Sequence, residues 1–254
     1  MLGNMPTEQV MTVLRAMPPK QAVGVLLAMT PDRVDALLSH MDDYAVGSML
    51  KAAEPQHCLL VLKSLAPPRV GGAMAAMPFN DAVQLLASLP EDWVMSVLDA
   101  VHPEYASALI DALPATIRAH VVEAMNPDRA TTVRLVSYCN HAIQALDRYA
   151  VTLIWLADDI HGPNLVAHAL NRTFGIAVRY IDDTLLTMQD VISAETAVSG
   201  HAVDATLIIT NAAPLEEVVR YQTHEADRGH LVQAVTWSEG LGEGVLGRAL
   251  VRLA

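Results

Sequence analysis

Apolar residues recur along the first half of the chain with a period of twelve. When the chain is written in rows of twelve from Pro6, the last position of every row is Met, Leu, Val or Ala, from Met17 to Met125, without an insertion or deletion. Apolar row positions five, eight, nine and twelve are spaced three, one and three residues apart, which is one face of an α-helix. The pattern therefore predicts one short amphipathic helix per row.

Proline near the start of most rows determines where each helix begins. The proline ring cannot continue a preceding helix, but it fits the first turn of a new one. Acidic residues such as Glu8, Asp32 and Glu91 fall in that first turn, where the helix dipole favours them. A helix of roughly eight or nine residues is too short to be stable alone, so the rows must stack and share a core. The N-terminal half is therefore predicted to be an α-helical solenoid of twelve-residue repeats.

Several rows resemble a known family. The rows MPPKQAVGVLLAM, MTPDRVDALLSHM and LPEDWVMSVLDAV are similar to the N-terminal cytosolic domain of MgtE-type magnesium transporters, and more loosely to the helical repeats of the flagellar switch protein FliG. The resemblance covers residues 6 to about 137 and implies a superhelix of short helices. Those transporters add regulatory modules and a membrane domain, for which this chain shows no counterpart.

The period of twelve ends near residue 127, and helical and strand patterns alternate after it. Three- and four-residue spacing predicts one or two longer helices over 128–160, and after a turn at 161–164 Asn164 is expected to cap a further helix. A continuous apolar run such as residues 205–210 is typical of a strand buried on both faces. The elements expected after the turn are a helix over 164–173, a strand over 176–181, a short helix over 184–193, a strand over 205–210, a helix over 215–227, a strand over 231–237 and a helix over 244–253. This alternation predicts a small α/β domain with a mostly parallel sheet. The expected domains are 1–137, a connecting helix over 138–162, and 163–254.

The last part of the chain also resembles a restriction-endonuclease-like domain of the Mrr type. Residues 205–253 are similar to its last third, and the helix and strand expected over 164–181 are similar to its opening. The resemblance implies a Mg²⁺ site made by an Asp on one strand and a Glu followed two residues later by a Lys on the next. The last lysine is Lys63, and only 23 residues separate the two strands, too few for the missing hairpin and helix. The resemblance therefore implies a degenerate domain that has lost its site.

Charge and composition restrict the partners. The chain carries 16 basic and 28 acidic residues, and the part from Tyr149 onward has six arginines, no lysine and thirteen acids. Because no basic stripe supplies phosphate contacts, nucleic acid is not the expected partner. Two cysteines make neither a disulfide framework nor a metal cluster, and Cys58 occupies a core position of its row. No leader opens the chain and no apolar run approaches the ~20 residues of a membrane span, so a cytoplasmic protein is expected.

Candidate binding residues follow the three expected strands. Asp182 and Asp183 follow the first, Asn211 the second and Ser238 the third. Carboxyl ends of parallel strands meet helix N-termini in one crevice, so these side chains are expected to lie together. Asn211 either caps the helix after its strand or reaches a ligand. His224 and His230 bracket a helix end, where they are expected to satisfy backbone carbonyls.

These patterns favour a non-enzymatic cytosolic interaction protein that binds a partner protein through its helical repeats. No catalytic residue, cofactor or metal ligand is predicted. Two alternatives stay open. One is a nucleic-acid-associated protein with a degenerate endonuclease-like domain. The other is a small-ligand sensor or enzyme that uses the crevice at the carboxyl ends of the strands.

Overall fold

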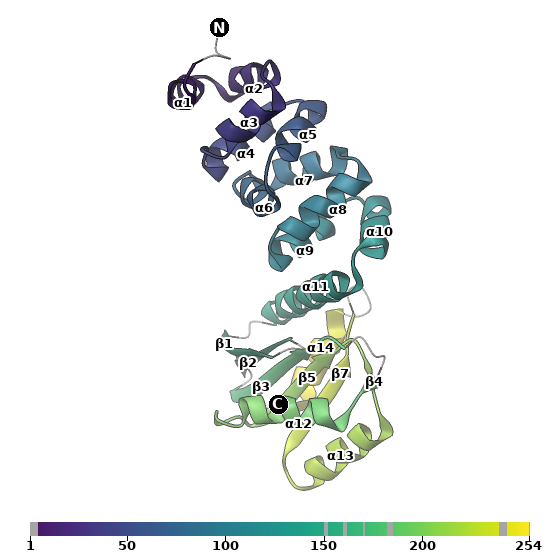
Figure 1. The fold of residues 1–254 in the computed structure, drawn as a ribbon. Coiled ribbons are helices and arrows are strands. Elements are labelled where there is room, and N and C mark those ends of the chain that lie inside the picture. The colour runs from purple at the N-terminus through teal and green to yellow at the C-terminus, as the bar shows by residue number, and fades with distance from the viewer. Residues whose placement is uncertain are drawn as a thin grey trace. The chain divides into compact units, whose positions relative to one another are not determined.

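Ten short helices, one for each row, follow one another in the computed structural model, which describes residues 5–149, 152–159, 162–169, 171–181, 185–238 and 243–253 (Figure 1). This confirms the predicted helical repeat. Their bounds are α1 Thr7–Ala16, α2 Pro19–Leu27, α3 Pro31–Leu38, α4 Asp43–Ala52, α5 Pro55–Lys63, α6 Pro67–Ala75, α7 Phe79–Ser88, α8 Glu91–Ala100, α9 Pro103–Ala112 and α10 Ala115–Ala124. The chain divides into two compact units, Met1–Ala130 and Thr131–Ala254, and the helices α1–α10 belong to the first.

The core of the first unit is built from the apolar row positions. The ninth row position supplies fully buried side chains such as Leu38, Leu62 and Leu86. Helices two rows apart pack together, as α4 does with α6 and α6 with α8. Their backbones approach closely, because a Cβ added at Gly71 in α6 would lie 2.4 Å from the carbonyl oxygen of Ala100 in α8. The repeat therefore needs a small residue at this crossing as well as its apolar face.

A second repeated feature closes the C-terminal ends of the helices. Side chains at the fourth row position donate hydrogen bonds to backbone carbonyls 28 or 31 residues earlier, at the end of the row three before. The bonds run from Arg33 to Met5, from Arg69 to Leu38 (2.7 Å) and Met41 (2.5 Å), from Tyr105 to Met74 (3.0 Å), and from Arg129 to Leu98 (2.7 Å) and Val101 (2.5 Å). The last carbonyls of a helix have no partner within it, and a cation suits the negative end of its dipole. These side chains therefore link rows that are distant in the sequence.

Helix α11 (Pro127–Asp147) leads into a five-stranded mixed sheet in the second unit. Its order is β1-β2-β3-β5-β7, and β2 runs opposite to the other four strands. The strands are β1 Thr152–Asp159, β2 Gly162–Ala169, β3 Arg172–Arg179, β5 Ala205–Thr210 and β7 Leu231–Thr236. The last three are parallel, which confirms the predicted α/β part. The short strands β4 (Leu185–Leu186) and β6 (Ala213–Pro214) pair separately.

Helices cover both faces of this sheet (Figure 1). On one face α11 and α14 (Glu243–Leu253) pack against side chains such as Phe174, Ile176 and Leu207. On the other face α12 (Met188–Val198) and α13 (Glu216–Asp227) pack against Ala177 and Ile208. A capping box of Thr187 and Asp190 starts α12. The second unit is therefore a three-layer α/β/α arrangement.

Two sequence predictions were wrong between residues 148 and 175. The expected helix over 128–160 ends at Asp147 and is followed by strand β1, and the expected turn and helix over 161–173 are the hairpin of β2 and β3. Asn164 lies within β2 opposite Ala177, so it caps no helix. The middle of β2 is buried on both faces. Periodicity alone does not distinguish such a strand from a buried helix.

Candidate functional site

Asn211 connects the carboxyl ends of two strands. Its Oδ1 accepts a hydrogen bond from the backbone N–H of Ile181 (2.8 Å), and its Nδ2 donates one to the carbonyl of the same residue (2.9 Å). The N-cap of α13 is Leu215, with no side-chain cap. The capping role considered for Asn211 is therefore wrong, and its amide instead extends the pairing between β3 and β5 beyond the last ladder residues.

Two of the four candidate residues, Asn211 and Ser238, lie in the part of the chain that the structure describes. Asp182 and Asp183 lie outside the described residues. Ser238 follows β7 and is half-buried. Both polar atoms of the Asn211 amide are hydrogen-bonded to the backbone of Ile181, so a ligand that binds this amide would have to break these bonds.

A buried arginine lies near the same edge of the sheet. Arg179, the last residue of β3, is fully buried, and its Nη2 donates to Oδ1 of Asn164 on β2 (2.6 Å). Its Nη1 lies 3.0–3.4 Å from the carbonyl oxygens of Gly162, Pro163 and Val178. Buried charges need hydrogen bonds on most of their donors, and these carbonyls provide them. Arg179 thus holds the start of β2 against the end of β3.

A hollow of about 440 Å³ lies at the opposite edge of the sheet. The C-terminal halves of α12 and α13, the loop before β5, the start of β5 and the residue before β7 form its walls. Its polar lining includes Glu195, Tyr221, Glu225, Thr206 and His230. Sequence reasoning did not select this edge, because ligands of open parallel sheets are expected at the carboxyl ends.

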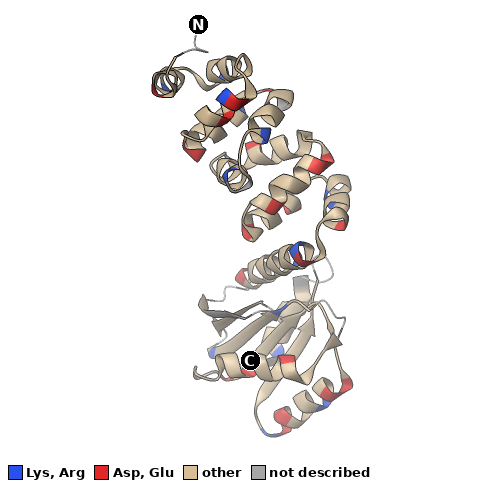
Figure 2. Ribbon diagram, viewed as in Figure 1, with Lys and Arg blue, Asp and Glu red and all other residues tan. Residues whose placement is uncertain are grey.

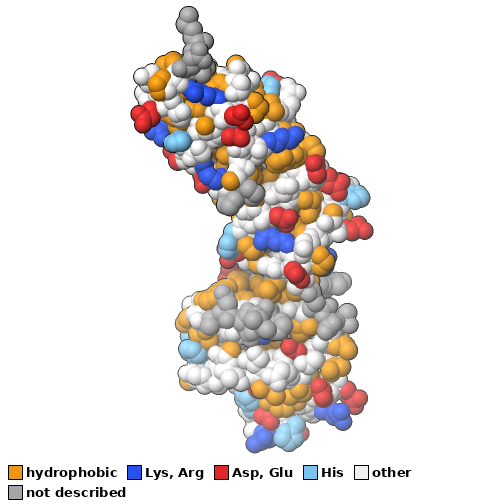
Figure 3. Space-filling model, in the orientation of Figure 1, with side chains coloured by type: hydrophobic (Ala, Val, Ile, Leu, Met, Phe, Trp, Pro, Cys, Tyr) orange, Lys and Arg blue, Asp and Glu red, His pale blue; other side chains and the backbone are white. Residues whose placement is uncertain are grey.

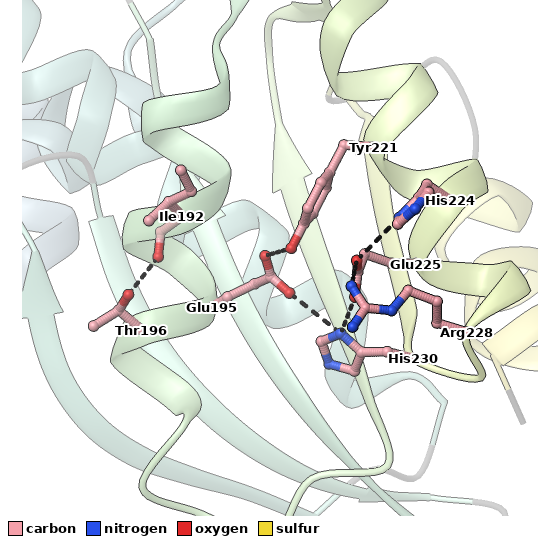
Figure 4. Close-up of polar contacts among 8 residues, drawn as sticks. All are labelled: Ile192, Glu195, Thr196, Tyr221, His224, Glu225, Arg228 and His230. Atoms are coloured by element: carbon pink, nitrogen blue, oxygen red, sulfur yellow. Dashed lines mark hydrogen bonds and ion pairs between the residues drawn. The ribbon is translucent and has the colours of Figure 1, made fainter.

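Four of these side chains form one polar cluster (Figure 4). The hydroxyl of Tyr221 donates to Oε2 of Glu195 (2.7 Å). Nδ1 of His230 lies 3.6 Å from Oε1 of Glu195 and 3.3 Å from Oε2 of Glu225. The cluster joins α12, α13 and the start of β7. The histidine was expected to satisfy helix-end carbonyls, but its ring faces two carboxylates.

Burial and hydrogen bonding shift the protonation of this cluster. Desolvation and the hydrogen bond to Glu195 raise the pKa of Tyr221 to about 12. Desolvation acts to raise the pKa of Glu225, but hydrogen bonds from His224 and His230 and the charge of Arg228 outweigh it and lower that pKa. At neutral pH the phenol is therefore protonated and the Glu225 carboxylate is charged.

A second hollow, apolar in character, lies on the helical repeat. It has a volume of about 450 Å³ between α2, α3 and α5, and we call it the repeat groove. Its lining consists of Leu26, Leu27, Met29, Pro31, Val34, Asp35, Leu60, Val61, Lys63 and Ser64. Leu60 is 52% exposed, although it is a large apolar side chain. The space-filling view shows hydrophobic side chains between charged ones on this unit (Figure 3).

Several kinds of site are not found in the part of the chain that the structure describes. No group of three His, Cys, Asp or Glu side chains there is placed to hold a metal ion. Acidic and basic side chains are scattered along the helices in Figure 2, and none of its described segments shows a continuous basic stripe. No described helix has both the length and the hydropathy needed to cross a membrane. Cys58 is buried, which raises its thiol pKa to about 11 and confirms its role as a core residue.

Comparison with known proteins supports the resemblance seen in the repeat. The family model of the MgtE intracellular N domain matches residues 41–138. A solved structure, described as the crystal structure of the soluble part of a magnesium transporter, is similar over 81% of this chain and 68% of that chain. The identity is 11% and the TM-score is 0.40. No curated protein matches the chain. The family match confirms an MgtE N-domain-like helical region, whereas the comparisons do not support the endonuclease-like resemblance.

Proposed function

We propose that this chain is a non-enzymatic cytosolic adaptor that binds a partner protein through its helical repeats. The repeat groove carries this proposal, because it combines exposed Leu60 with apolar walls from three helices. An amphipathic helix that lays its apolar face into such a groove is a common mode of recognition. The intracellular setting of the matched family supports the cytosolic location.

The lining of the groove suits a helical partner. Met29 and the leucines provide deformable apolar surface, which adapts to different side chains. Asp35 and Lys63 provide one charge of each sign. A partner helix with one basic and one acidic residue beside its apolar face could pair with Asp35 and Lys63. Such complementary charges would favour one orientation of the helix in the groove.

Affinity capture with a matched pair of variants tests the proposal. Leu60→Glu places a charge in the groove at a position that is already half exposed, so the repeat should fold while the partner is lost. The control is Val219→Glu on α13, where the replaced side chain is 47% exposed and the charge change is the same. Loss of the captured protein with Leu60→Glu alone supports the proposal. Equal capture by both variants contradicts it.

A nucleic-acid-associated protein with a degenerate endonuclease-like domain is the second candidate. The Mrr-type resemblance implies an acid on one strand and an acid-x-cation sequence on the next. The paired strands β2 and β3 place Asn164 opposite Ala177, two residues before Arg179. The hairpin of β2 and β3 precedes the parallel crossover from β3 to β5. Strands β2 and β3 contain no carboxylate and no lysine, so this candidate is a degenerate domain without the metal-binding residues.

A duplex-binding assay separates this candidate from the first. Fluorescence anisotropy of a labelled duplex at two salt concentrations measures binding, which should weaken steeply with salt if phosphate contacts carry it. Incubation of a linear duplex with Mg²⁺ should leave it intact, because the two carboxylates that hold the ion are missing. Cleavage that EDTA abolishes would contradict the degenerate assignment.

A ligand sensor or enzyme that uses the carboxyl ends of the parallel strands is the third candidate. Asn211, Ser238, Asp182 and Asp183 are its proposed residues. Asn211→Asp does not test this candidate, because an aspartate carboxylate would lose the hydrogen bond that Nδ2 donates to the carbonyl of Ile181. A thermal-shift panel of metabolites with Ser238→Ala as the control variant tests it. Equal shifts in both proteins would exclude Ser238 from a ligand site.

A further inference from the structure

Two carboxylates share one imidazole nitrogen at the hollow beside the amino ends of β5 and β7. Oε1 of Glu195 and Oε2 of Glu225 both face Nδ1 of His230. This nitrogen carries at most one proton, so it donates to one carboxylate oxygen at a time. The two glutamate side chains are only 16% and 13% exposed, so bulk water has limited access to them. A negative pair is therefore held at the wall of an open hollow.

Positive side chains near the cluster neutralise it only in part. The guanidinium of Arg228 lies 3.3 Å and Nδ1 of His224 lies 3.4 Å from Oε1 of Glu225, the oxygen that does not face His230. Tyr221 donates to the second oxygen of Glu195 and adds no charge. The helices α12 and α13 both end beside this hollow, and helix C-termini carry partial negative charge. The local field therefore favours a cation.

Thr206 provides an independent sign of a ligand. It is 1% exposed and lines the hollow, and its hydroxyl has no hydrogen-bond partner among the described residues. Strand alternation puts its side chain on the same face of β5 as Ile208, which packs in the core beneath α12 and α13. Buried hydroxyl groups normally have a partner. A bound molecule with an N–H donor would satisfy this oxygen and the carboxylates together.

We propose that this hollow binds a small organic cation, a primary ammonium or guanidinium compound. Such a group donates several hydrogen bonds from one positive centre, which matches two carboxylates and a hydroxyl around one space. The aliphatic side chains of Ile192, Val198 and Val203 line the remainder and suit a short alkyl chain. The site is separate from the repeat groove, so it does not depend on the adaptor role.

Calorimetric titration of the full chain with agmatine, which carries both cationic groups, tests the proposal at neutral pH and low salt. Glu195→Gln and Glu225→Gln should each weaken binding by about tenfold or more, as expected for loss of a charged hydrogen bond. Thr206→Val keeps the shape and charge and should weaken it less. The control is Glu217→Gln, which removes the same charge from an exposed position of α13 and should leave the affinity unchanged.

Several outcomes of the same titration would contradict the proposal. No heat from agmatine at millimolar concentration, or equal affinity in all four variants, would overturn the proposal. Glutarate, a dianion of similar length, should not bind. Binding of glutarate in preference to agmatine would show that the hollow does not select cations. Far-UV circular dichroism of each variant confirms that any loss occurs in a folded protein.

Discussion

Replacing Arg69 should weaken one specific helix end. Its Nη1 and Nη2 donate to the carbonyls of Leu38 and Met41 at the C-terminus of α3, and Nε and Nη2 contact Oδ1 of Asp43 at 3.0 and 2.8 Å. Hydrogen bonds to charged groups contribute roughly 1.5–3 kcal/mol each, less where water can replace the donor. With Arg69 26% exposed, Arg69→Met should lower the free energy of unfolding by about 2–4 kcal/mol.

The ion pair with Asp43 accounts for little of this effect. The Asp43 side chain is 43% exposed, and exposed pairs contribute about 0–1 kcal/mol. Asp43→Asn is therefore the matched control, since it removes the pair and leaves both carbonyl bonds. Similar losses of stability in Arg69→Met and Asp43→Asn would refute the reasoning, because the carbonyls would then contribute nothing beyond the surface pair.

Urea unfolding and hydrogen exchange measure the two effects. With a slope of about 1–3 kcal/mol per molar urea, Arg69→Met should move the midpoint of the helical signal down by roughly 1–2 M. Because the chain has two units, a single transition is not assumed. Amide exchange gives the local readout: it should accelerate at the end of α3 but not at the end of α8, which Arg129 closes in the same way.

Three further predictions concern glycine, cysteine and acid stability. Gly71→Ala should destabilise the repeat by about 1–3 kcal/mol in a urea melt, because the added Cβ would meet the backbone carbonyl of Ala100. The control is Gly24→Ala, whose Cβ would meet nothing within 4 Å and which should stabilise the repeat by about 0.5–1 kcal/mol. Cys58 should react with a thiol reagent at pH 8 only after unfolding, and labelling of the native protein at the rate of free cysteine would contradict its raised pKa. Glu225 has a lowered pKa, so its contribution to stability is present above its ordinary value of about 4.5 and is lost as the pH falls through its folded value. Carboxyl NMR should place its midpoint below 4.5 and Arg228→Gln should raise it; an unchanged midpoint would show that Arg228 has no influence.

Elements whose signals lie close together in the chain could be predicted from the sequence. Proline, the first-turn acid and the apolar face of one row lie within twelve residues, so each helix of the repeat could be predicted from its own row. The buried strand β5 was equally clear, because six apolar or small residues stand between turn signals. The position of Asn211 after β5 was also predicted, but its partner, the backbone of Ile181, was not.

Contacts between residues that are distant in the chain could not be predicted from the sequence pattern. Residues 152–159 and 162–169 carry no period that separates strand from helix. Residues 162–169 form a strand because they pair with β3, and residues 152–159 form one because they pair with β2. Arg69 and Arg129 look like surface residues in their rows, since the carbonyls they close lie 28 and 31 residues away. The hollow at the amino ends of β5 and β7 is lined by Glu195 and Glu225, which lie on separate helices. The two carboxylates line one hollow only because both helices pack on the same face of the sheet.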